Sequence, residues 1–412
     1  MENICIVLNA FYPFNPGETF LANEMKYLTS FDKIFVAPIH GTALKNHFDY
    51  KKNQNAVVWE MPNFDTINKL IYSVKTLFSV DFYCELNDLF KSNRLTKHNV
   101  FKALRFCAHG SFCADSLIKK IKKVRIDNAN SRIVLYSYWM NLDAYIGVRI
   151  KKRMTTETKF VTRAHRVDIY EYADESGYIP MRRSIIRNAD KLYPISEDGK
   201  QYLIQCYNVS PEKIEVSRLG TMDHGVNISD KGNILSLVSC SWVRKVKRLD
   251  LIIDALSKVD FPVCWTHFGD GDEMENLKDK LNTFSNDKVK INFVGSMSNE
   301  KVLEMYSENS YNAFINVSSS EGVPVSIMEA MSFGKIIIAT DVGGTKEIVE
   351  DGLNGFLLPC EFKVEQLRYV LEHIYEMNED QYSKMCISSR KIWETKSNAE
   401  KNYCDFVKNL IS

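Results

Sequence analysis

The sequence lacks a long hydrophobic run, and none of its apolar stretches approaches the roughly 18 residues of a membrane-spanning helix. Its first residues, MENICIVLNAFYPF, also lack a basic segment ahead of the apolar stretch and a small-residue cleavage site. We therefore expect the chain to begin with a buried strand, and we expect neither a signal peptide nor a membrane span.

Signals for metal binding are also missing. No two of the 10 cysteines form a C-x-x-C pair, and the 8 histidines show no spacing typical of metal ligands. We interpret the cysteines as reduced, buried small hydrophobes of a cytoplasmic protein. Gly269-Asp270-Gly271-Asp272 imitates a metal-binding D-x-D motif, but it follows a predicted strand and fits an ordinary tight turn. The sequence thus predicts no metal site and no cofactor.

Two further motif classes are absent. There is no G-x-G-x-x-G, so a dinucleotide site is not indicated, and no recognised nucleic-acid-binding module accompanies the basic residues. What is present is an alternation of strand and helix patterns in both halves of a 412-residue chain. This length exceeds one ordinary core, so we expect two doubly wound α/β domains with a cleft between them. The polar, glycine-containing segment 219–227 places the boundary near residue 225.

Charge divides unevenly between these halves. Residues 1–225 carry 32 Lys and Arg against 24 Asp and Glu, and the remainder carries 21 against 28. Residues 101–166 alone hold 15 basic against 4 acidic side chains. A solvated helix face is one interpretation of this segment, and contact with an anionic surface such as the inner face of a membrane is the other.

The most informative stretch is residues 318–358. Glu321 and Glu329 flank a loop of small residues that leads into a helix, predicted over 327–333 with Ser326 as N-cap and Gly334 as C-cap. Backbone N–H groups at such a helix start favour a phosphate, and the carboxylates can accept hydrogen bonds from sugar hydroxyls. A nucleotide-sugar satisfies both requirements. The alternative for Glu329 is a capping box with Ser326.

The strings EGVP, SIMEAM, FGK, GGTKEIVEDG and NGFLL occur here in order, and this stretch resembles the donor-binding half of family 4 glycosyltransferases, which have the GT-B fold. The resemblance implies a retaining enzyme that moves a sugar from a UDP- or GDP-linked donor to a glycan or lipid-linked acceptor in surface polysaccharide or glycoconjugate synthesis. It also implies that Glu321 binds hydroxyls of the donor sugar and that Glu329 binds the ribose. The donor site would include the residues between them, namely Gly322, Val323, Val325 and Ser326.

Segments of the N-terminal half resemble the same family. RAHRVDIYEY is similar to the family's R-x-H-x-x-D segment, which implies that His165 contacts the donor sugar, and Asp168 is placed to fix its tautomer. The loop after the first strand corresponds to one that relatives place over the donor phosphates and acceptor. Gly17 and Glu18 are therefore candidates, with a plain turn as the alternative. Relatives also have a last helix that crosses back to the first domain, so we expect domains at 1–225 and 226–392, with 393–412 forming that helix.

One departure from the family concerns the diphosphate. Relatives place an arginine just after the first strand of the second domain and a lysine six residues later, and these positions hold Ser241 and Lys247 here. Arg244, in the same loop, is a candidate substitute because a guanidinium can bind phosphate oxygens bidentately. Alternatively Arg244 faces water and Ser241 donates one hydrogen bond.

No side chain is placed as a covalent nucleophile. The resemblance therefore implies attack by the acceptor from the leaving-group face, with the protein positioning the reactants and stabilising phosphate charge. Two other functions remain open at this point. They are a catalytically silent partner subunit of the same fold and a sugar-nucleotide 2-epimerase.

Overall fold

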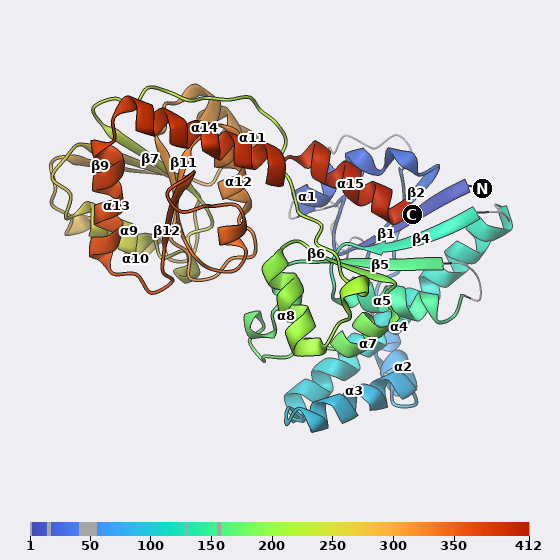
Figure 1. Cartoon of the computed structure of the whole chain (residues 1–412). Helices are drawn as coiled ribbons and strands as arrows, with labels where there is room; N and C mark the ends of the chain where they lie inside the picture. Colours follow the sequence, from blue (N-terminus) through green and yellow to red (C-terminus); the bar gives the residue numbers. More distant parts are fainter. Residues whose placement is uncertain (1, 15–17, 41–55, 128–130, 155–157, 412) are drawn as a thin grey trace. The chain divides into compact units, whose positions relative to one another are not determined.

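The computed structural model describes residues 2–14, 18–40, 56–127, 131–154 and 158–411 (Figure 1). The chain divides into two compact units, Met1–Ser217 with Tyr403–Ser412, and Arg218–Asn402. The first unit thus ends earlier than residue 225. The segment after Ser217 lies with the second unit because Arg218 pairs with Glu347 and Asp223 pairs with Arg390.

A parallel six-stranded sheet forms the centre of the first unit, in the order β3-β2-β1-β4-β5-β6. Its strands are β1 (Glu2–Asn9), β2 (Lys33–Pro38), β3 (Ala56–Val58), β4 (Ser131–Ser137), β5 (Thr158–Ala164) and β6 (Lys191–Pro194). The order of the strands reverses between β1 and β4, which are neighbours in the sheet. Doubly wound sheets bind ligands at the carboxyl ends of the strands that flank such a reversal.

Both faces of this sheet are buried, as the apolar runs predict. In β1, Ile4, Ile6 and Leu8 enter one hydrophobic cluster, while Cys5 and Val7 enter another, because successive side chains of a strand point to opposite faces. The helices of the first unit are α1 (Thr19–Glu24), α2 (Thr66–Thr76), α3 (Val80–Lys91), α4 (Lys97–Asp127), α5 (Leu142–Lys151), α6 (Arg166–Ile169), α7 (Arg182–Asn188), α8 (Glu197–Tyr207) and α15 (Ala399–Ile411).

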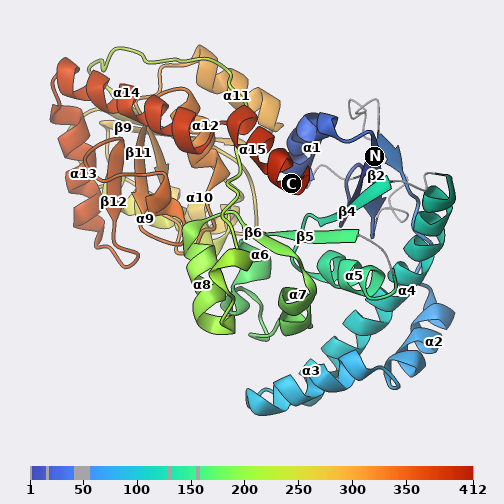
Figure 2. The same cartoon turned by 45° about the vertical axis from the view of Figure 1, so that its right-hand side comes forward.

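Two peripheral features of the first unit matter below. Helices α2 and α3 pack on α4, and Figures 1 and 2 show them beside that helix, away from the strands. The end of α15 supplies Phe406, Val407 and Leu410 to the cluster that contains Cys5 and Val7. None of the helices in the described ranges has the length and hydrophobicity needed to cross a bilayer.

The second unit repeats the plan with a parallel sheet in the order β12-β11-β10-β7-β8-β9. Its strands are β7 (Leu235–Cys240), β8 (Val263–Phe268), β9 (Val289–Gly295), β10 (Ala313–Asn316), β11 (Ile336–Thr340) and β12 (Gly355–Leu358). Its helices are α9 (Leu249–Leu256), α10 (Met274–Asn282), α11 (Asn299–Glu308), α12 (Val325–Ser332), α13 (Val364–Glu376) and α14 (Glu379–Lys396). Here the strand order reverses between β7 and β10.

Three segments differ from the structure that their local sequence favours. Residues 214–218 alternate apolar and polar side chains as a strand does, but the structure has only a single bridge there, between Leu192 and Ile214, because the segment meets only the short edge strand β6. Residues 18–29 have the pattern of one amphipathic helix, but the helix changes after Glu24 into a 3₁₀ helix, Met25–Ser30. The residues after the Gly343-Gly344 turn favour the start of a helix near Thr345, but they form one 3₁₀ turn, Thr345–Glu347.

Candidate functional site

In the first unit, Glu18 joins the loops that follow β1 and β4. Its buried carboxylate accepts the backbone N–H groups of residues 10–12, at 3.2, 2.7 and 2.5 Å, and the indole N–H of Trp139 at 2.5 Å. The contact between Glu18 and Trp139 therefore crosses the reversal between β1 and β4. Glu18 holds the shape of the first loop through these bonds. Gly17, the other candidate in this loop, lies outside the described residues.

His165 follows β5 directly, at the same edge of the sheet. Its ring packs against Tyr138 and Trp139, with centroid distances of 4.7 and 4.5 Å. The side chain is buried, and within the described ranges neither ring nitrogen has a hydrogen-bond partner. Both ring nitrogens are shielded from solvent in this structure. A neutral imidazole has one donor and one acceptor nitrogen, so His165 could bind hydroxyl groups only of a ligand that displaced the residues around the ring.

Asp168 supports His165 through the backbone. Its carboxylate accepts the N–H of His165 and, at 2.6 Å, the N–H of Met140. The distance from Asp168 Oδ2 to His165 Nδ1 is 3.9 Å, which is too long for a hydrogen bond. The prediction that Asp168 fixes the tautomer of the ring is therefore wrong in this structure. The two backbone N–H groups occupy the carboxylate, and Asp168 orients the segment that carries the ring.

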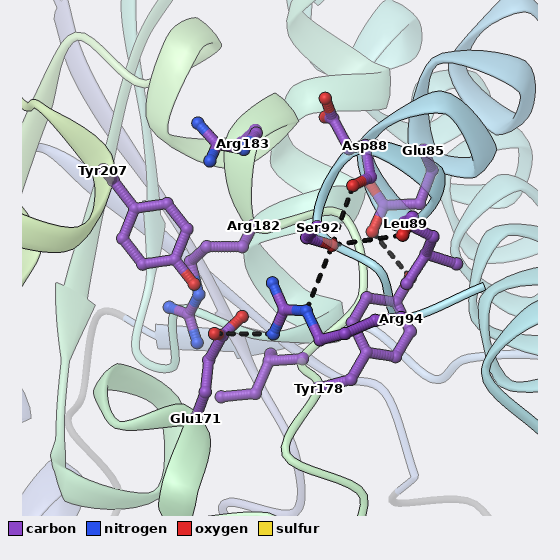
Figure 3. Close-up of a pocket in the computed structure, with 11 residues that line it drawn as sticks. Glu85, Asp88, Leu89, Ser92, Arg94, Glu171, Tyr178, Arg182, Arg183 and Tyr207 are labelled. Atoms are coloured by element: carbon purple, nitrogen blue, oxygen red, sulfur yellow. Dashed lines mark hydrogen bonds and ion pairs between the residues drawn. The ribbon is translucent and has the colours of Figure 1, made fainter. Parts of the chain in front are cut away.

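Figure 3 shows a small polar pocket next to this segment, lined by residues of α3, α7 and the chain after α6. Arg94 pairs with Glu171 at 2.7 Å, and the hydroxyl of Tyr178 donates to Glu85 at 2.6 Å. The pocket has a volume of about 20 Å³, which admits roughly one water molecule. The charged side chains that line it are Arg94, Arg182, Arg183, Glu85, Asp88 and Glu171, so opposite charges balance. We interpret the pocket as structural.

Arg182 connects this pocket to the His165 segment. Its guanidinium is buried and donates one long bond, 3.4 Å, from Nη1 to the carbonyl of Met140, whose N–H is bound by Asp168. Within the described residues, Nε and Nη2 of Arg182 have no hydrogen-bond acceptor. Burial lowers the pKa of this guanidinium. Sequence reasoning missed this residue, because its role depends on burial beneath a distant loop.

In the second unit, the main polar contact joins Lys247 to Glu321. Lys247 ends a 3₁₀ turn (Lys245–Lys247) after β7, and Glu321 lies in the loop after β10. Lys247 Nζ is 2.6 Å from Glu321 Oε1, which also accepts Asn316 Nδ2 at 3.3 Å. The two side chains are 22% and 13% exposed, so solvent reaches both. This contact crosses the reversal between β7 and β10.

Ser241 and Arg244 lie in the loop that precedes Lys247. The N–H of Ser241 donates to the carbonyl of Phe268 at 3.0 Å, which ties this loop to the end of β8. The side chain of Arg244 is exposed, with its guanidinium 5.9 Å from the ring centroid of Trp242. The loop therefore presents a second cation at the surface, three residues before Lys247.

Arg248 was also missed by sequence reasoning. It has a left-handed backbone, with φ of +50°, and its guanidinium donates to the carbonyls of Val317 at 2.8 Å, Ser318 at 3.2 Å and Cys360 at 2.7 Å. These bonds fix the loop of Lys247 against the loop of Glu321. The loop contains four cations, whereas only Arg244 and Lys247 were predicted to bind phosphate. This surplus of positive charge was the signal that could have drawn attention to Arg248.

The loop after Glu321 enters α12 two residues earlier than predicted. Pro324 is the N-cap and α12 begins at Val325, so Ser326 lies in the first turn and is not the cap. Pro324 has an extended backbone, and its carbonyl accepts the N–H groups of Ile327 and Met328 at 3.2 and 3.3 Å, which are the first bonds of the helix. The N–H groups of Val325 and Ser326 belong to the first turn, which leaves them without a carbonyl partner inside the helix. They follow Gly322 and Val323 at the carboxyl end of β10.

Two glycines hold this loop in place. Gly343 has φ of +53°, and a Cβ atom on it would lie 2.0 Å from the carbonyl oxygen of Glu321. The N–H of Gly344 donates to the carbonyl of Gly322 at 2.6 Å. The turn after β11 thus packs directly on the backbone that carries Glu321.

Glu329 lies inside α12 and is only 7% exposed. Its Oε1 accepts the side-chain N–H of Asn299, the first residue of α11, at 2.7 Å. The capping-box interpretation is therefore wrong, because the helix begins before Ser326 and Glu329 bonds to another helix. Burial raises the pKa of Glu329 to about 7, and the bond from Asn299 opposes this shift. Asn299 was also missed, since nothing in its local sequence links it to Glu329.

The structure pairs many cations of the basic segment 101–166 with nearby carboxylates. The pairs are Lys102 with Asp174, Arg149 and Lys152 with Asp81, Lys151 with Asp190, and Arg153 with Asp115. Lys119, Lys122 and Lys123 have exposed side chains on α4. Internal ion pairing thus accounts for part of the positive charge in this segment.

Residues 226–391 match the family described as glycosyl transferases group 1. WbnH of Escherichia coli, an O-antigen biosynthesis glycosyltransferase, is 25% identical over 253 residues, which are 57% of this chain and 68% of WbnH. The GtfA subunit of a UDP-N-acetylglucosamine–peptide N-acetylglucosaminyltransferase from Streptococcus agalactiae is 30% identical over 130 residues, 31% of this chain and 24% of that subunit. The chain thus spans about half or less of the length of several curated relatives that it matches.

The fold of the whole chain has a solved counterpart. HepE from Anabaena, solved in complex with UDP and glucose, matches with a TM-score of 0.66 at 15% identity, covering 100% of both chains. The prediction of two doubly wound parallel sheets is confirmed. This chain therefore has the GT-B fold, and its residues 226–391 match the model of the glycosyl transferases group 1.

Proposed function

We propose that this protein is a retaining glycosyltransferase that moves a sugar from a UDP- or GDP-linked donor to a glycan or lipid-linked acceptor in surface polysaccharide synthesis. The observation that carries the proposal is the Lys247–Glu321 contact at the strand reversal of the second unit. It puts a cation for a diphosphate and a carboxylate for sugar hydroxyls at one point. That point lies in the part of the chain that matches group 1.

The other candidate residues take roles that fit their chemistry. Glu329 binds the ribose, and its raised pKa of about 7 means that the carboxylate form predominates only above neutrality before a ligand adds hydrogen bonds. The N–H groups at the start of α12 bind phosphate oxygens with the helix dipole. His165 binds a hydroxyl of the donor sugar through its unpartnered ring nitrogens.

The reaction proceeds by attack of an acceptor hydroxyl on the anomeric carbon. A bond forms between the acceptor oxygen and this carbon, and the bond between the carbon and the phosphate oxygen breaks. The proton of the hydroxyl passes to the departing nucleoside diphosphate. Lys247 and the α12 amides stabilise the negative charge on that diphosphate, so the donor replaces Glu321 as the main partner of Lys247.

We further propose that no metal ion is required, because Lys247, Arg244 and the amides supply positive charge at this point. Retention of activity in the presence of EDTA tests this directly. A loss of activity with EDTA that added Mg²⁺ restores would overturn the metal-independent form of the proposal.

The test of the function begins with the melting temperature of the full chain in the presence of UDP, GDP and ADP sugars. A ligand at 100 times its Kd should add about 2.7 kcal/mol of stability. The preferred donor is then incubated with lipid-linked or soluble saccharide acceptors, and transferred sugar is measured together with the anomeric configuration of the product. Glu321→Gln is the test variant. Glu300→Gln, which changes an exposed carboxylate on α11, is the matched control.

Each outcome discriminates between functions. Transfer with retained configuration, lost in Glu321→Gln and kept in Glu300→Gln, supports the proposal. Donor binding without transfer or hydrolysis indicates a silent partner subunit. Conversion of the sugar-nucleotide without an acceptor indicates an epimerase, and an inverted product overturns the retaining mechanism.

A further inference from the structure

The first unit exposes a stripe of large apolar side chains on α2 and the turn after it. Ile67, Leu70, Ile71 and Val74 recur at the spacing of one helix face, and Phe78 and Val80 continue the surface toward α3. Ile67 and Leu70 are 70% and 69% exposed, and Phe78 is 84% exposed. We call these six residues the α2 stripe. An amphipathic helix of a globular protein normally turns such a face toward the core.

The opposite face of α2 fixes this orientation. The hydroxyl of Tyr72 donates to Asp115 of α4 at 2.8 Å, and its ring meets Phe112 of α4 edge-on at a centroid distance of 5.3 Å. Thr76, also on this face, is buried. Asp65 caps the start of the helix by accepting the N–H of Asn68 at 2.8 Å. The helix is thus anchored on α4 through Tyr72 and Thr76, and the α2 stripe faces outward.

The exposed charges around the stripe are predominantly positive. Asp65 is the exposed carboxylate among the described residues 65–105, whereas the exposed cations there are Lys69, Lys75, Lys91, Lys97 and Arg105. The remaining acids of this range face inward or are paired. Asp81 pairs with Arg149 and Lys152, Glu85 accepts the hydroxyl of Tyr178, and Asp88 is half-buried in the lining of the small polar pocket. An exposed apolar face flanked by lysines is the pattern of helices that lie in the interface of an anionic bilayer.

We propose that α2, the turn after it and α3 dock on an anionic lipid bilayer, with the α2 stripe inserted among the headgroups and the surrounding lysines bound to phosphates. This inference rests on the proposed function in one respect, since it gives the enzyme direct access to a lipid-linked acceptor. It moves the expected membrane contact from the segment 101–166 to residues 67–80. The alternative occupant, a second copy of this chain, is disfavoured because it would bring two positively charged rims together.

The experiment is co-sedimentation of the full chain with vesicles of phosphatidylcholine alone and with vesicles that also contain phosphatidylglycerol, at low and high salt. The test variant is Ile67→Ser/Leu70→Ser/Phe78→Ser. Its matched control removes three exposed apolar side chains elsewhere, Val294→Ser/Leu353→Ser/Ile387→Ser. All six positions are solvent-exposed, so unchanged melting temperatures are expected and are checked first. Lys69→Gln/Lys75→Gln tests the electrostatic part.

We expect the parent and the matched control to bind anionic vesicles, and the stripe variant to bind them about tenfold or more weakly. The lysine variant should lose affinity for anionic vesicles only, and salt should weaken parent binding. A fluorescence blue shift of Phe78→Trp on adding vesicles would place the turn in the bilayer. Equal binding by the parent and the stripe variant overturns the inference, as does an absence of parent binding at low salt.

Sedimentation velocity of the same proteins distinguishes docking on a membrane from docking on a second copy of this chain. A dimer that the stripe variant converts to a monomer, with vesicle binding unchanged, would assign the surface to a second copy and overturn the membrane inference. Stabilisation by nucleotide-sugar is measured in parallel. If it persists while vesicle binding fails, only this inference is lost. If it fails while vesicle binding holds, only the proposed function is lost.

Discussion

Lys247 Nζ lies 2.6 Å from Glu321 Oε1, and this ion pair connects the loops of two strands that are neighbours in the sheet, although the two residues are 74 positions apart along the chain. The pair is partly buried, and its position at the strand reversal marks the ligand edge of the second unit. A donor diphosphate at this edge would compete with Glu321 for the same ammonium group. Under the proposed function, donor binding would therefore depend on both members of the pair and on the residues that hold their loops together.

Lys247→Ala should lower the turnover number for sugar transfer by about a hundredfold or more, because it removes the charge that stabilises the departing diphosphate and leaves Glu321 without its cation. Steady-state kinetics with the preferred donor measure this. Lys245→Ala, an exposed lysine in the same 3₁₀ turn, is the control and should keep the parent rate. A parent-like rate for Lys247→Ala would show that Lys247 does not stabilise the departing diphosphate.

Arg244→Ala should lower transfer by about tenfold or more, the effect expected when one charge-assisted hydrogen bond to phosphate is lost. Arg244 would compensate for the serine at position 241, since its exposed guanidinium is free to turn from Trp242 toward a phosphate. Replacing Ser241 with Arg in the Arg244→Ala background should restore part of the rate. If Arg244→Ala transfers sugar at the parent rate, the guanidinium faces water and does not bind the donor phosphates.

Glu329→Gln should change the pH dependence of stability. Burial raises the pKa of Glu329 from 4.5 to about 7, so between these values the folded protein holds a proton that the unfolded chain releases. Stability therefore falls as pH rises through this window, by about 3 kcal/mol in total for such a shift. The glutamine variant does not ionise and should be more stable than the parent at pH above 7, with the difference vanishing as the pH falls below 4.5.

Urea unfolding across this pH range measures the effect, with Glu300→Gln as the control. A difference between parent and Glu329→Gln that does not depend on pH would contradict the assignment. The same variant should bind the free nucleotide more weakly, because an amide accepts fewer hydrogen bonds from ribose hydroxyls than a carboxylate does.

Gly343→Ala should destabilise the loop of Glu321 and reduce donor binding. A Cβ atom there would meet the Glu321 carbonyl oxygen at 2.0 Å, in addition to the strain of a positive φ. Gly352→Ala is a close control, because Gly352 also has a positive φ, +75°, but a Cβ atom on it would meet nothing within 4 Å among the described residues. Both variants should lose about 1 kcal/mol from backbone strain, and only Gly343→Ala should also weaken donor affinity. Equal donor affinity in the two variants would contradict this.

Asp168→Asn should lower stability by about 1–3 kcal/mol, since one amide oxygen replaces two carboxylate oxygens that accept separate backbone N–H groups. It should also lower transfer, because the segment that carries His165 would shift. The double variant with His165→Ala should transfer no more slowly than His165→Ala alone, as Asp168 acts through His165. Additive losses would show a separate role for Asp168.

Many strands of both sheets were predictable because buried parallel strands have distinctive sequence patterns, and the patterns at residues 263–268 and 313–316 coincide with the strands Val263–Phe268 and Ala313–Asn316. No strand was expected at β2, β3 or β12. Errors arose where local signals compete. Ser326 is a good capping residue, but Pro324 caps the helix two residues earlier. Residues 214–218 alternate apolar and polar side chains as a strand does, but they have only the edge strand β6 to pair with.

The candidate site was predictable as a set of residue types at the ends of strands, but its contacts were not. The bonds of Arg248 depend on a left-handed backbone, and that of Asn299 to Glu329 joins two helices. The role of Asp168 also depends on tertiary structure, because its second partner is the N–H of Met140 in another loop. The local sequence around a residue does not show which distant residues it contacts in the fold.

The packing of α15 has a consequence for how the protein is made. Phe406, Val407 and Leu410 belong to the core of the first unit, and the ring of Phe406 lies 4.1 Å from the buried guanidinium of Arg163. During synthesis on the ribosome, the first unit therefore cannot complete its core until the whole second unit has been translated. The second unit, a continuous segment, can finish folding first. The order of maturation would then be the reverse of the order of synthesis.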